Sequence, residues 1–450
     1  MRRKVYDKLV SWKEKSKGRT ALLIDGARRV GKSYIAEEFA KNNYKSYLLL
    51  DFNKVPDEIK ILFDKYLDNL DDLFLYLSNY YNVDLYERES LIIFDEVQLY
   101  PRARSALKYL VADGRYDYLE TGSLVSIKEN VKDILIPSEE QHLKMLPLDF
   151  EEFCWALGNN NIMDLIRNCF DEKKPLNEAL HRKAMDYFRK YLIVGGMPQA
   201  VMEYVNTNNF KDVDQVKRNI LDLYRDDIKR HAGKYSLKVE RIYDLLPSQL
   251  QKHEKKFKIT SLDKDAKSRD YEDAFVWLDD AMIVNHCFNT TEPNVGLSLN
   301  LDNSYMKCYM ADTGLLLSHS FNENEVYVEE IYKKILFDKL EYNGGMIIEN
   351  VVAQMLVASG HKLFFYSNYS RGSCDDRMEI DFLISKSNIT SRHNVSPIEV
   401  KSGKNYTLTS INKFKKRYKE QLSTCYVVHT GTLKVEDDVI YLPLYMVPLL

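Results

Sequence analysis

The chain has 450 residues, which is more than one hydrophobic core usually serves, so we expect two to four domains. Hydrophobic residues make up 45% and charged residues 29%, with only 17 Gly and 11 Pro, which excludes a collagen-like, low-complexity or wholly disordered chain. The formal net charge is −3, so binding to nucleic acid or to a membrane would need a local basic patch, since no overall basic field exists.

The N-terminus and the cysteines indicate the compartment. The basic residues 1–19 are followed by no apolar segment of the kind that signal peptides carry, and no run of about 18 apolar residues occurs. No CxxC pair occurs, and the six cysteines stand singly: Cys154, Cys169, Cys287, Cys308, Cys374 and Cys425. We therefore expect reduced, buried thiols in a cytoplasmic protein that has no membrane partner.

Residues 21–119 alternate strand-like and helix-like segments. The apolar runs ALLID and LIIF are typical of strands that are buried on both faces, and helical spacing separates such runs. This pattern predicts an α/β fold, a parallel sheet with crossover helices. The predicted strands are 21–25, 47–51, 91–94 and 116–119, and the predicted helices are 33–41 and 102–112.

The pattern changes near Pro147 to helix after helix, with no good strand before about residue 280 and a Gly/Pro break at residues 195–198. Two helices near 242–250 and 271–281, followed by a short strand pair that begins at MIVNHCF, are compatible with a winged-helix module. Beyond residue 305 a second mixed α/β region is predicted, with helices at 347–358 and 408–419 and strands at 363–366, 379–385, 397–401 and 425–430.

A phosphate-binding loop follows the first predicted strand. The residues from Gly26 to Ser33 fit the pattern GxxxxGK[ST] between a strand and a helix. Its backbone N–H groups and the start of the helix face an anion, Lys32 reaches the β- and γ-phosphates, and the Ser33 hydroxyl can hold Mg²⁺. The residues predicted to bind nucleotide here are Gly26, Ala27, Arg28, Arg29, Val30, Gly31, Lys32, Ser33 and Tyr34.

Two acids end the predicted strand 91–94. Asp95 is placed to hold the Mg²⁺ ion, and Glu96 is placed to orient or deprotonate the attacking water, so the pair predicts hydrolysis as well as binding. Exposed acids after a strand are also common as solvated loop residues. Thr121, at the end of the next strand, is predicted to contact the nucleotide as a γ-phosphate sensor, and the alternative is that Ser123 caps a helix.

These residues resemble microbial AAA+ ATPases that carry a C-terminal domain of unknown function. The motifs that carry the resemblance are Tyr6, Leu9 and Trp12, then LLIDGARRVGKS (22–33), LIIFDEVQ (91–98), LETGS (119–123), LPLDFEEF (146–153) and GGMP (195–198). The resemblance covers essentially the whole chain and implies an AAA+ core in which Lys32, Ser33, Asp95 and Glu96 have their usual roles.

One departure from that family concerns arginine. Many members place a Gly-Arg pair shortly before the segment that corresponds to residues 146–153, whereas no arginine occurs here between Leu124 and Ile166. The arginine that would complete the transition-state charge is therefore unassigned, and the candidates are Arg102, Arg104 and Arg115.

A second group of charged residues lies near the C-terminus. Glu399 and Lys401 share a face of one predicted strand, Asp381 lies on the neighbouring strand and Glu349 on the preceding helix. Carboxylates beside a lysine can bind a divalent metal and activate water against a phosphodiester. The arrangement resembles the PD-(D/E)xK nuclease superfamily, which implies Asp381, Glu399 and Lys401 as catalytic residues and Glu349, Asp381 and Glu399 as metal ligands. Charged residues alternating on a half-exposed strand also produce such a pattern by chance.

Two basic stretches are weaker signals. The helix that contains residues 413–419 follows where the nuclease fold often faces DNA, and HEKKFK (253–258) can contact phosphates or form a solvated helix end. No paired histidine spacing points to zinc. Residues 312–314 predict a turn before a helix.

The predicted architecture has four parts: an AAA+ P-loop ATPase core (1–145), a helical lid (146–232), a winged-helix-like segment (233–303) and a restriction-endonuclease-like α/β domain (304–450). The predicted function is ATP hydrolysis with Mg²⁺, coupled to DNA binding or cleavage by the C-terminal domain. The alternative is a nucleotide-switched module that binds DNA or protein through an inactive nuclease-like domain. Only the first of these two functions predicts metal-dependent DNA cleavage that is lost in Lys401→Ala. The sequence does not determine whether the protein self-associates.

Overall fold

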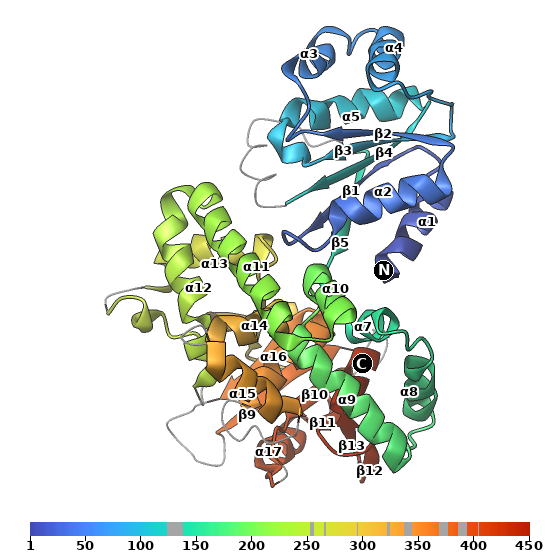
Figure 1. The fold of residues 1–450 in the computed structure, drawn as a ribbon. Helices are drawn as coiled ribbons and strands as arrows, with labels where there is room; N and C mark the ends of the chain where they lie inside the picture. Colours follow the sequence, from blue (N-terminus) through green and yellow to red (C-terminus); the bar gives the residue numbers. More distant parts are fainter. Residues whose placement is uncertain are drawn as a thin grey trace. The chain divides into compact units, whose positions relative to one another are not determined.

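The computed structural model describes ten stretches of the chain: 1–123, 138–252, 256–264, 267–294, 296–321, 325–336, 344–368, 377–385, 394–403 and 405–450. Contacts divide the chain into two compact units (Figure 1). The N-terminal unit comprises Met1–Leu146 and Asp280–Met282, and the C-terminal unit comprises Pro147–Asp279 and Ile283–Leu450.

A five-stranded parallel sheet forms the centre of the N-terminal unit, in the order β2-β3-β4-β1-β5. Three of the strands are buried along their whole length, because helices cover both faces of the sheet. The sequence missed β5, since this edge strand is largely polar and exposed. The strands are β1 (Ala21–Gly26), β2 (Ser46–Asp51), β3 (Ser90–Asp95), β4 (Asp117–Gly122) and β5 (Glu140–Met145).

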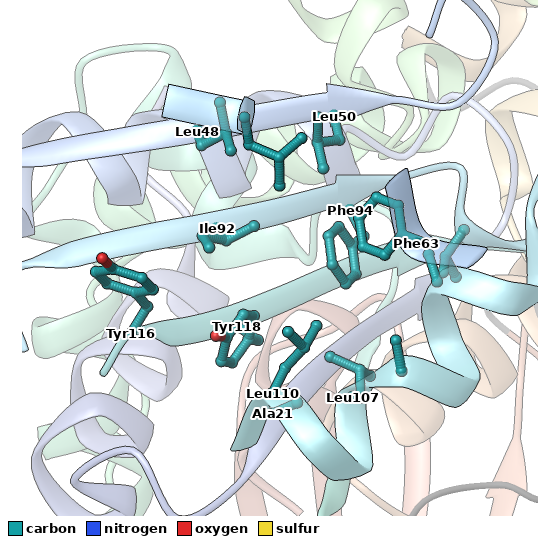
Figure 2. Close-up of a cluster of buried hydrophobic side chains, with 14 of the residues drawn as sticks. Ala21, Leu48, Leu50, Phe63, Ile92, Phe94, Leu107, Leu110, Tyr116 and Tyr118 are labelled. Carbon is teal, nitrogen blue, oxygen red and sulfur yellow. The ribbon is translucent and has the colours of Figure 1, made fainter. Parts of the chain in front are cut away.

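Two hydrophobic cores cover the two faces of this sheet. One core joins α1 and α2 to the sheet through Leu9, Trp12 and Phe39, and Figure 2 shows the other, in which Phe63 and Phe94 pack together. The predicted α/β arrangement is therefore confirmed for this unit. The helices are α1 (Lys4–Ser16), α2 (Lys32–Asn43), α3 (Asp57–Lys65), α4 (Leu70–Tyr81) and α5 (Pro101–Asp113), with a short 3₁₀ turn, η1 (Val97–Leu99).

The C-terminal unit begins with helices, as the sequence predicts. Between Pro147 and residue 280, the described residues form helices and 3₁₀ turns and no named strand. The helices are α7 (Phe150–Ala156), α8 (Ile162–Asp171), α9 (Glu178–Val194), α10 (Pro198–Thr207), α11 (Phe210–His231), α12 (Ser236–Gln251) and α13 (Glu272–Asp280), and the 3₁₀ turns are η2 (Gly233–Tyr235), η3 (Ile259–Ser261) and η4 (Ser268–Asp270).

An eight-stranded mixed sheet follows, in the order β12-β13-β11-β10-β9-β8-β6-β7. The pairs β6–β8, β10–β11 and β11–β13 are parallel, and the other neighbours are antiparallel. The strands are β6 (Val284–Thr290), β7 (Leu301–Met310), β8 (Leu363–Asn368), β9 (Met378–Ser385), β10 (Val395–Val400), β11 (Cys425–His429), β12 (Lys434–Glu436) and β13 (Val439–Pro443).

Four further helices accompany this sheet. A hydrophobic cluster that includes Ile380, Ile411, Phe414 and Val427 packs α17 against β9 and its neighbours. The helices are α14 (Thr313–Ser320), α15 (Glu325–Leu336), α16 (Gly344–Ala358) and α17 (Thr409–Tyr418), and the 3₁₀ turns are η5 (Leu297–Asn300) and η6 (Leu444–Leu449).

The segment 233–303, predicted to resemble a winged helix, does not stand apart from the C-terminal sheet. Its predicted boundary at residue 303 lies inside β7, and its strand β6 pairs in parallel with β8. Residues 233–303 therefore supply β6 and the first part of β7 to the same sheet as the C-terminal residues. The division of the chain into four domains remains a prediction.

Three sequence motifs meet at one junction in the C-terminal unit. The Leu148 N–H donates to the Gly196 carbonyl at 2.7 Å, and the Gly196 N–H donates to the Asp312 carboxylate at 2.6 Å. A Cβ on Gly196 would lie 2.2 Å from the Leu148 carbonyl oxygen, so only glycine fits there. Asp312 also accepts from the Leu315 N–H and caps α14. Of the predicted turn 312–314, only Asp312 precedes the helix, because Thr313 and Gly314 already belong to α14. The segments LPLDFEEF and GGMP and the residues 312–314 are therefore joined by hydrogen bonds inside the C-terminal unit.

No helix in the described part of the chain is both long and apolar enough to cross a membrane. The five described cysteines are free thiols, and all but Cys169 are buried. Cys374 lies outside the described residues.

Candidate functional site

The phosphate-binding loop joins the end of β1 to the start of α2, as predicted. Gly31 precedes α2 with φ +97°, a left-handed conformation that favours glycine. Arg29 adopts φ +67°, which is uncommon for a residue with a side chain and marks a strained loop. Arg29, Ser33 and Tyr34 are exposed, whereas Ala27 and Val30 are buried. Their contacts with a nucleotide remain predictions.

Two features fix the loop against β5. A Cβ on Gly26 would lie 2.4 Å from the Met145 carbonyl oxygen, so glycine permits this close approach. The buried Arg3 guanidinium donates to the Val30 carbonyl at 3.3 Å and to the Leu146 carbonyl at 2.6 Å. Arg3 therefore ties the loop to the end of β5. No sequence pattern indicates this role of Arg3, because both acceptors are backbone atoms.

Lys32 lies in the loop with neutral partners. Its Nζ donates to the carbonyls of Gly26 at 3.0 Å and Ala27 at 3.1 Å. Burial lowers the pKa of Lys32, while the charges of Glu96 and Asp95 oppose the shift. No carboxylate hydrogen-bonds this ammonium within the described residues, so phosphate oxygens can replace the carbonyls.

The Asp95 carboxylate connects the loop to two strands. The Ser33 hydroxyl donates to Asp95 Oδ1 at 2.7 Å, and the Thr121 hydroxyl donates to the same oxygen. Thr121 is fully buried, and its Oγ1 also accepts from the Glu96 N–H at 3.3 Å. Thr121 therefore positions the two acids here, and direct contact with a γ-phosphate remains a prediction. The helix that Ser123 would cap lies outside the described residues.

Glu96 directly follows β3 with φ +54°, a left-handed conformation that non-glycine residues rarely adopt. The Gln98 amide donates to Glu96 Oε2 and holds the carboxylate. Gln98 was not predicted, although its place two residues beyond Glu96 was the available signal. The geometry leaves Glu96 partly exposed at the carboxyl edge of the sheet, next to Asp95.

The arginine candidates are all engaged in ion pairs. Arg104 is 1% exposed and pairs with Glu140 through two hydrogen bonds of 2.6 and 2.9 Å. Arg115 pairs with Asp113 and Asp71, and Arg102 pairs with Asp64. The structure assigns none of these arginines to a nucleotide.

The C-terminal charged residues surround a lysine that the sequence analysis missed. Lys307 on β7 is 1% exposed. Its Nζ lies 2.8 Å from Glu379 Oε1, 3.3 Å from Glu349 Oε1 and 3.9 Å from Asp381 Oδ1. Burial by itself would lower the pKa of Lys307, but Glu379 and Asp381 raise it above its usual value. A lone lysine in the otherwise apolar end of β7 was the signal available in the sequence.

Glu399 and Lys401 form a separate ion pair at 2.5 Å. Burial raises the pKa of Glu399, the nearby charge of Asp381 adds to the shift, and Lys401 opposes it. Asp381 accepts from the Val400 N–H at 2.7 Å and so links β9 to β10. The structure thus brings all four predicted C-terminal residues into one neighbourhood, together with Lys307 and Glu379.

A lysine ammonium lies among the carboxylates of this neighbourhood. Across the described residues, no three or more His, Cys, Asp or Glu side chains form a group that could hold a metal ion. The Lys307 ammonium instead supplies the positive charge beside Glu349 and Asp381. Metal binding by Glu349, Asp381 and Glu399 remains a prediction.

The lysines of the two basic stretches, 413–419 and 253–258, are not all exposed and unpaired, as those of a simple phosphate-binding face would be. Lys415 on α17 pairs with Asp438, and Lys416 is exposed. In HEKKFK, Lys256 is buried and Lys258 exposed. Residues 253–255 of this stretch lie outside the described part.

Comparisons with known families agree with the site in the N-terminal unit. Residues 18–154 match the family described as "AAA domain". This part of the chain is similar to P-loop ATPase domains. Residues 185–325 match "Domain of unknown function (DUF8612)", and residues 344–447 match "Domain of unknown function (DUF4143)". A search of curated proteins finds no match to the chain.

Three solved structures show distant similarity. A Walker-type ATPase of Pyrococcus abyssi is 14% identical, with a TM-score of 0.40 over 71% of this chain and 95% of that protein. PCH-2 of C. elegans is 13% identical, with a TM-score of 0.27 over 48% and 68%. The ORC1 protein of Aeropyrum pernix, solved in complex with DNA, is 11% identical, with a TM-score of 0.24 over 74% and 92%. At these TM-scores, the similarities indicate nothing about substrate or partner.

Proposed function

We propose that the N-terminal unit binds ATP with Mg²⁺ and hydrolyses it, and that the protein acts in the cytoplasm. The observation that carries the proposal is the Asp95 carboxylate, which accepts hydrogen bonds from Ser33 of the phosphate loop and Thr121 of β4. Glu96 lies beside it, held by Gln98. A phosphate loop, a metal-binding acid and a second acid for water are the parts that ATP hydrolysis requires.

The residues of the loop fit the group that they would hold. Ser33 and Asp95 offer the oxygen ligands that Mg²⁺ prefers, and the ion would neutralise charge on the β- and γ-phosphates. The Lys32 ammonium leaves the loop carbonyls and binds phosphate oxygens. Glu96 orients the attacking water and accepts its proton, while Gln98 keeps the Glu96 carboxylate in place.

The first test is the variant Glu96→Gln. ATP binding should persist, because the loop, Lys32 and Asp95 are unchanged, whereas hydrolysis should fall by about 10²–10⁴-fold with the loss of the proton acceptor. Phosphate release and ATP binding are measured on the same preparation. Glu58→Gln, an exposed position on α3, is the matched control. Equal hydrolysis by Glu96→Gln and the wild type would refute the assignment.

For the C-terminal unit, we propose that the nucleotide state controls binding to DNA. The Lys307 ammonium lies beside Glu349 and Glu379, where a nuclease would need a metal, which argues against cleavage. If the nucleotide state controls binding, the affinity for DNA should differ between the ATP-bound Glu96→Gln protein and the nucleotide-free protein. Fluorescence anisotropy with a labelled duplex measures that difference, and identical affinities in both states would contradict the coupling.

The competing function is DNA cleavage by Asp381, Glu399 and Lys401. It predicts nicking of supercoiled or single-stranded DNA with Mg²⁺ or Mn²⁺, with or without ATP, and loss of nicking in Lys401→Ala. We expect no cleavage in any of these conditions. Nicking that disappears in Lys401→Ala would establish the nuclease and overturn the binding proposal.

A further inference from the structure

A cavity of about 410 Å³ lies in the C-terminal unit, at one edge of its sheet. β10 and β11 run parallel, with Val400 beside Val428, so the residues that come next, 401–403 and 429–431, lie side by side at the carboxyl ends of the two strands. Gly403, His429 and Gly431 from these segments line the cavity, and α9 supplies further lining residues. The crevice outside the carboxyl ends of parallel strands is the usual place for a ligand in such sheets.

The lining of this cavity is basic. Its charged side chains are Arg182 and Arg189 from α9 and Lys434 from β12, and two histidines accompany them. None of the ten described residues that line it is acidic. The acids that pair with the three cations do not line the cavity and are 56–78% exposed: Glu178, Asp186 and Glu436.

Two imidazoles also line the cavity and offer hydrogen-bonding nitrogens. His181 Nδ1 lies 2.9 Å from the Tyr445 hydroxyl, and His429 Nε2 lies 3.2 Å from the Thr432 carbonyl oxygen, to which it donates. Burial lowers the pKa of both histidines. Positive charge nearby adds to this, from Arg189 at His181 and from Lys434 at His429. Both imidazoles are therefore held in the neutral form, and the positive charge of the cavity comes from Arg182, Arg189 and Lys434.

One glycine makes room for this arrangement. A Cβ on Gly431 would lie 2.8 Å from Cε1 of the His429 ring. The Tyr406 hydroxyl lies 3.4 Å from His429 Nδ1 and lines the same cavity. The His429 ring therefore lies between Tyr406 and Gly431, and its position requires that residue 431 has no side chain.

We propose that this cavity binds a phosphate-bearing ligand the size of one nucleotide. Guanidinium and ammonium groups bind phosphate oxygens through charge-assisted hydrogen bonds, and three cations suit a phosphomonoester dianion better than a single carboxylate. A volume of about 410 Å³ is within the range of small-ligand pockets and excludes a duplex. The phosphate comes from a free nucleotide or from the end of a nucleic-acid strand. The proposal uses no residue of the ATP site and does not depend on ATP hydrolysis.

The test is titration calorimetry on the full-length protein carrying Lys32→Ala, which removes competition from the phosphate loop. The probes are AMP, tetrathymidylate with a 5′-phosphate and the same oligonucleotide with a 5′-hydroxyl. The double variant Arg182→Glu/Lys434→Glu should weaken binding of the phosphorylated probes at least tenfold. Both side chains are largely exposed, at 70% and 46%, so the fold should persist, and thermal unfolding checks this.

The matched control is Lys416→Glu/Lys419→Glu, which makes the same charge change at exposed positions on and just after α17. Binding of AMP and of the phosphorylated oligonucleotide identifies a free nucleotide as sufficient, and binding of the phosphorylated oligonucleotide alone identifies a strand end. Both support the proposal. It is overturned if neither phosphorylated probe binds, if the 5′-hydroxyl probe binds equally well, or if both double variants weaken binding equally.

A second variant, Gly431→Ala, tests the shape of the cavity at constant charge. It should weaken binding by displacing the His429 ring, whereas Gly344→Ala, where an added Cβ meets nothing within 4 Å, should not. Unchanged affinity in Gly431→Ala would contradict a role for His429.

Discussion

Two buried lysines, one in each unit, are held by different partners. Lys32 donates to two neutral carbonyls of its own loop, and burial lowers its pKa. Lys307 lies among carboxylates, and Glu379 and Asp381 raise its pKa despite burial. In the phosphate loop, the Lys32 ammonium can exchange its carbonyl partners for phosphate oxygens, whereas the Lys307 ammonium is already neutralised by carboxylates. The same residue type therefore indicates a ligand site in one unit and an internal ion cluster in the other.

The largest expected effect in this comparison is on stability, at Lys307. In Lys307→Met, Glu349 and Glu379 lose their buried cation, and removing one partner of such a cluster costs about 3–5 kcal/mol. Urea denaturation of the full-length variant measures the loss. If Lys307→Met is as stable as the wild type, the Lys307 ammonium does not stabilise the carboxylates around it.

The same urea denaturation, repeated with Mn²⁺, tests whether the Lys307 ammonium occupies the position of a cation. Mn²⁺ should stabilise Lys307→Met and leave the wild type unchanged, because only the variant offers carboxylates without an internal cation. If Mn²⁺ stabilises the wild type equally, the Lys307 ammonium does not occupy the cation position, and the case for cleavage is strengthened.

The next effect concerns activity, at Lys32. Lys32→Ala should lose the rise in melting temperature that ATP gives and should hydrolyse ATP about 10²–10³-fold more slowly, because a charge that binds the phosphates is missing. Stability without nucleotide should hardly change, since only carbonyl partners are lost. Lys41→Ala, exposed on the same helix and paired with Glu37, is the control. Retained ATP binding in Lys32→Ala would contradict the site.

A smaller effect is expected at Thr121. Thr121→Val keeps the shape of the side chain but removes the hydroxyl that donates to Asp95 and accepts from the Glu96 N–H. ATP hydrolysis should fall about tenfold, which corresponds to ~1.4 kcal/mol in the barrier. Thr121→Ser should restore it. Steady-state kinetics decide, and wild-type turnover in Thr121→Val would show that the hydroxyl has no part in positioning the acids.

The smallest effect is expected at an exposed ion pair. Lys415→Met makes the same substitution as Lys307→Met, but the partner Asp438 is 72% exposed. The loss in unfolding free energy should be at most about 1 kcal/mol. A loss as large as that of Lys307→Met would show that burial is not what separates the two lysines.

The N-terminal unit could largely be predicted because its chemistry is local in sequence. The phosphate loop from Gly26 to Ser33 is one contiguous segment, and Asp95 and Glu96 directly follow an apolar strand. Arg3 could not be predicted, because it reaches Val30 through a backbone carbonyl 27 residues away.

The C-terminal unit was harder to predict because its contacts are long-range. The sequence placed Glu399 with Lys401, and the structure pairs them. Lys307 meets Glu349 and Glu379 only because β6 enters the sheet beside β8, a pairing that no local pattern specifies. The segment 233–303 shows the same limit, since its helices and strand were predicted while its partner sheet was not.

The place of β6 in the eight-stranded sheet determines where the chain can be cut. The match to a domain of unknown function begins at residue 344, but β6 and β7 lie before it. A fragment starting there would expose one edge of β8 to pairing with other chains. It would also leave Glu349 and Glu379 without Lys307. A fragment that is to keep this sheet intact therefore has to begin ahead of Val284.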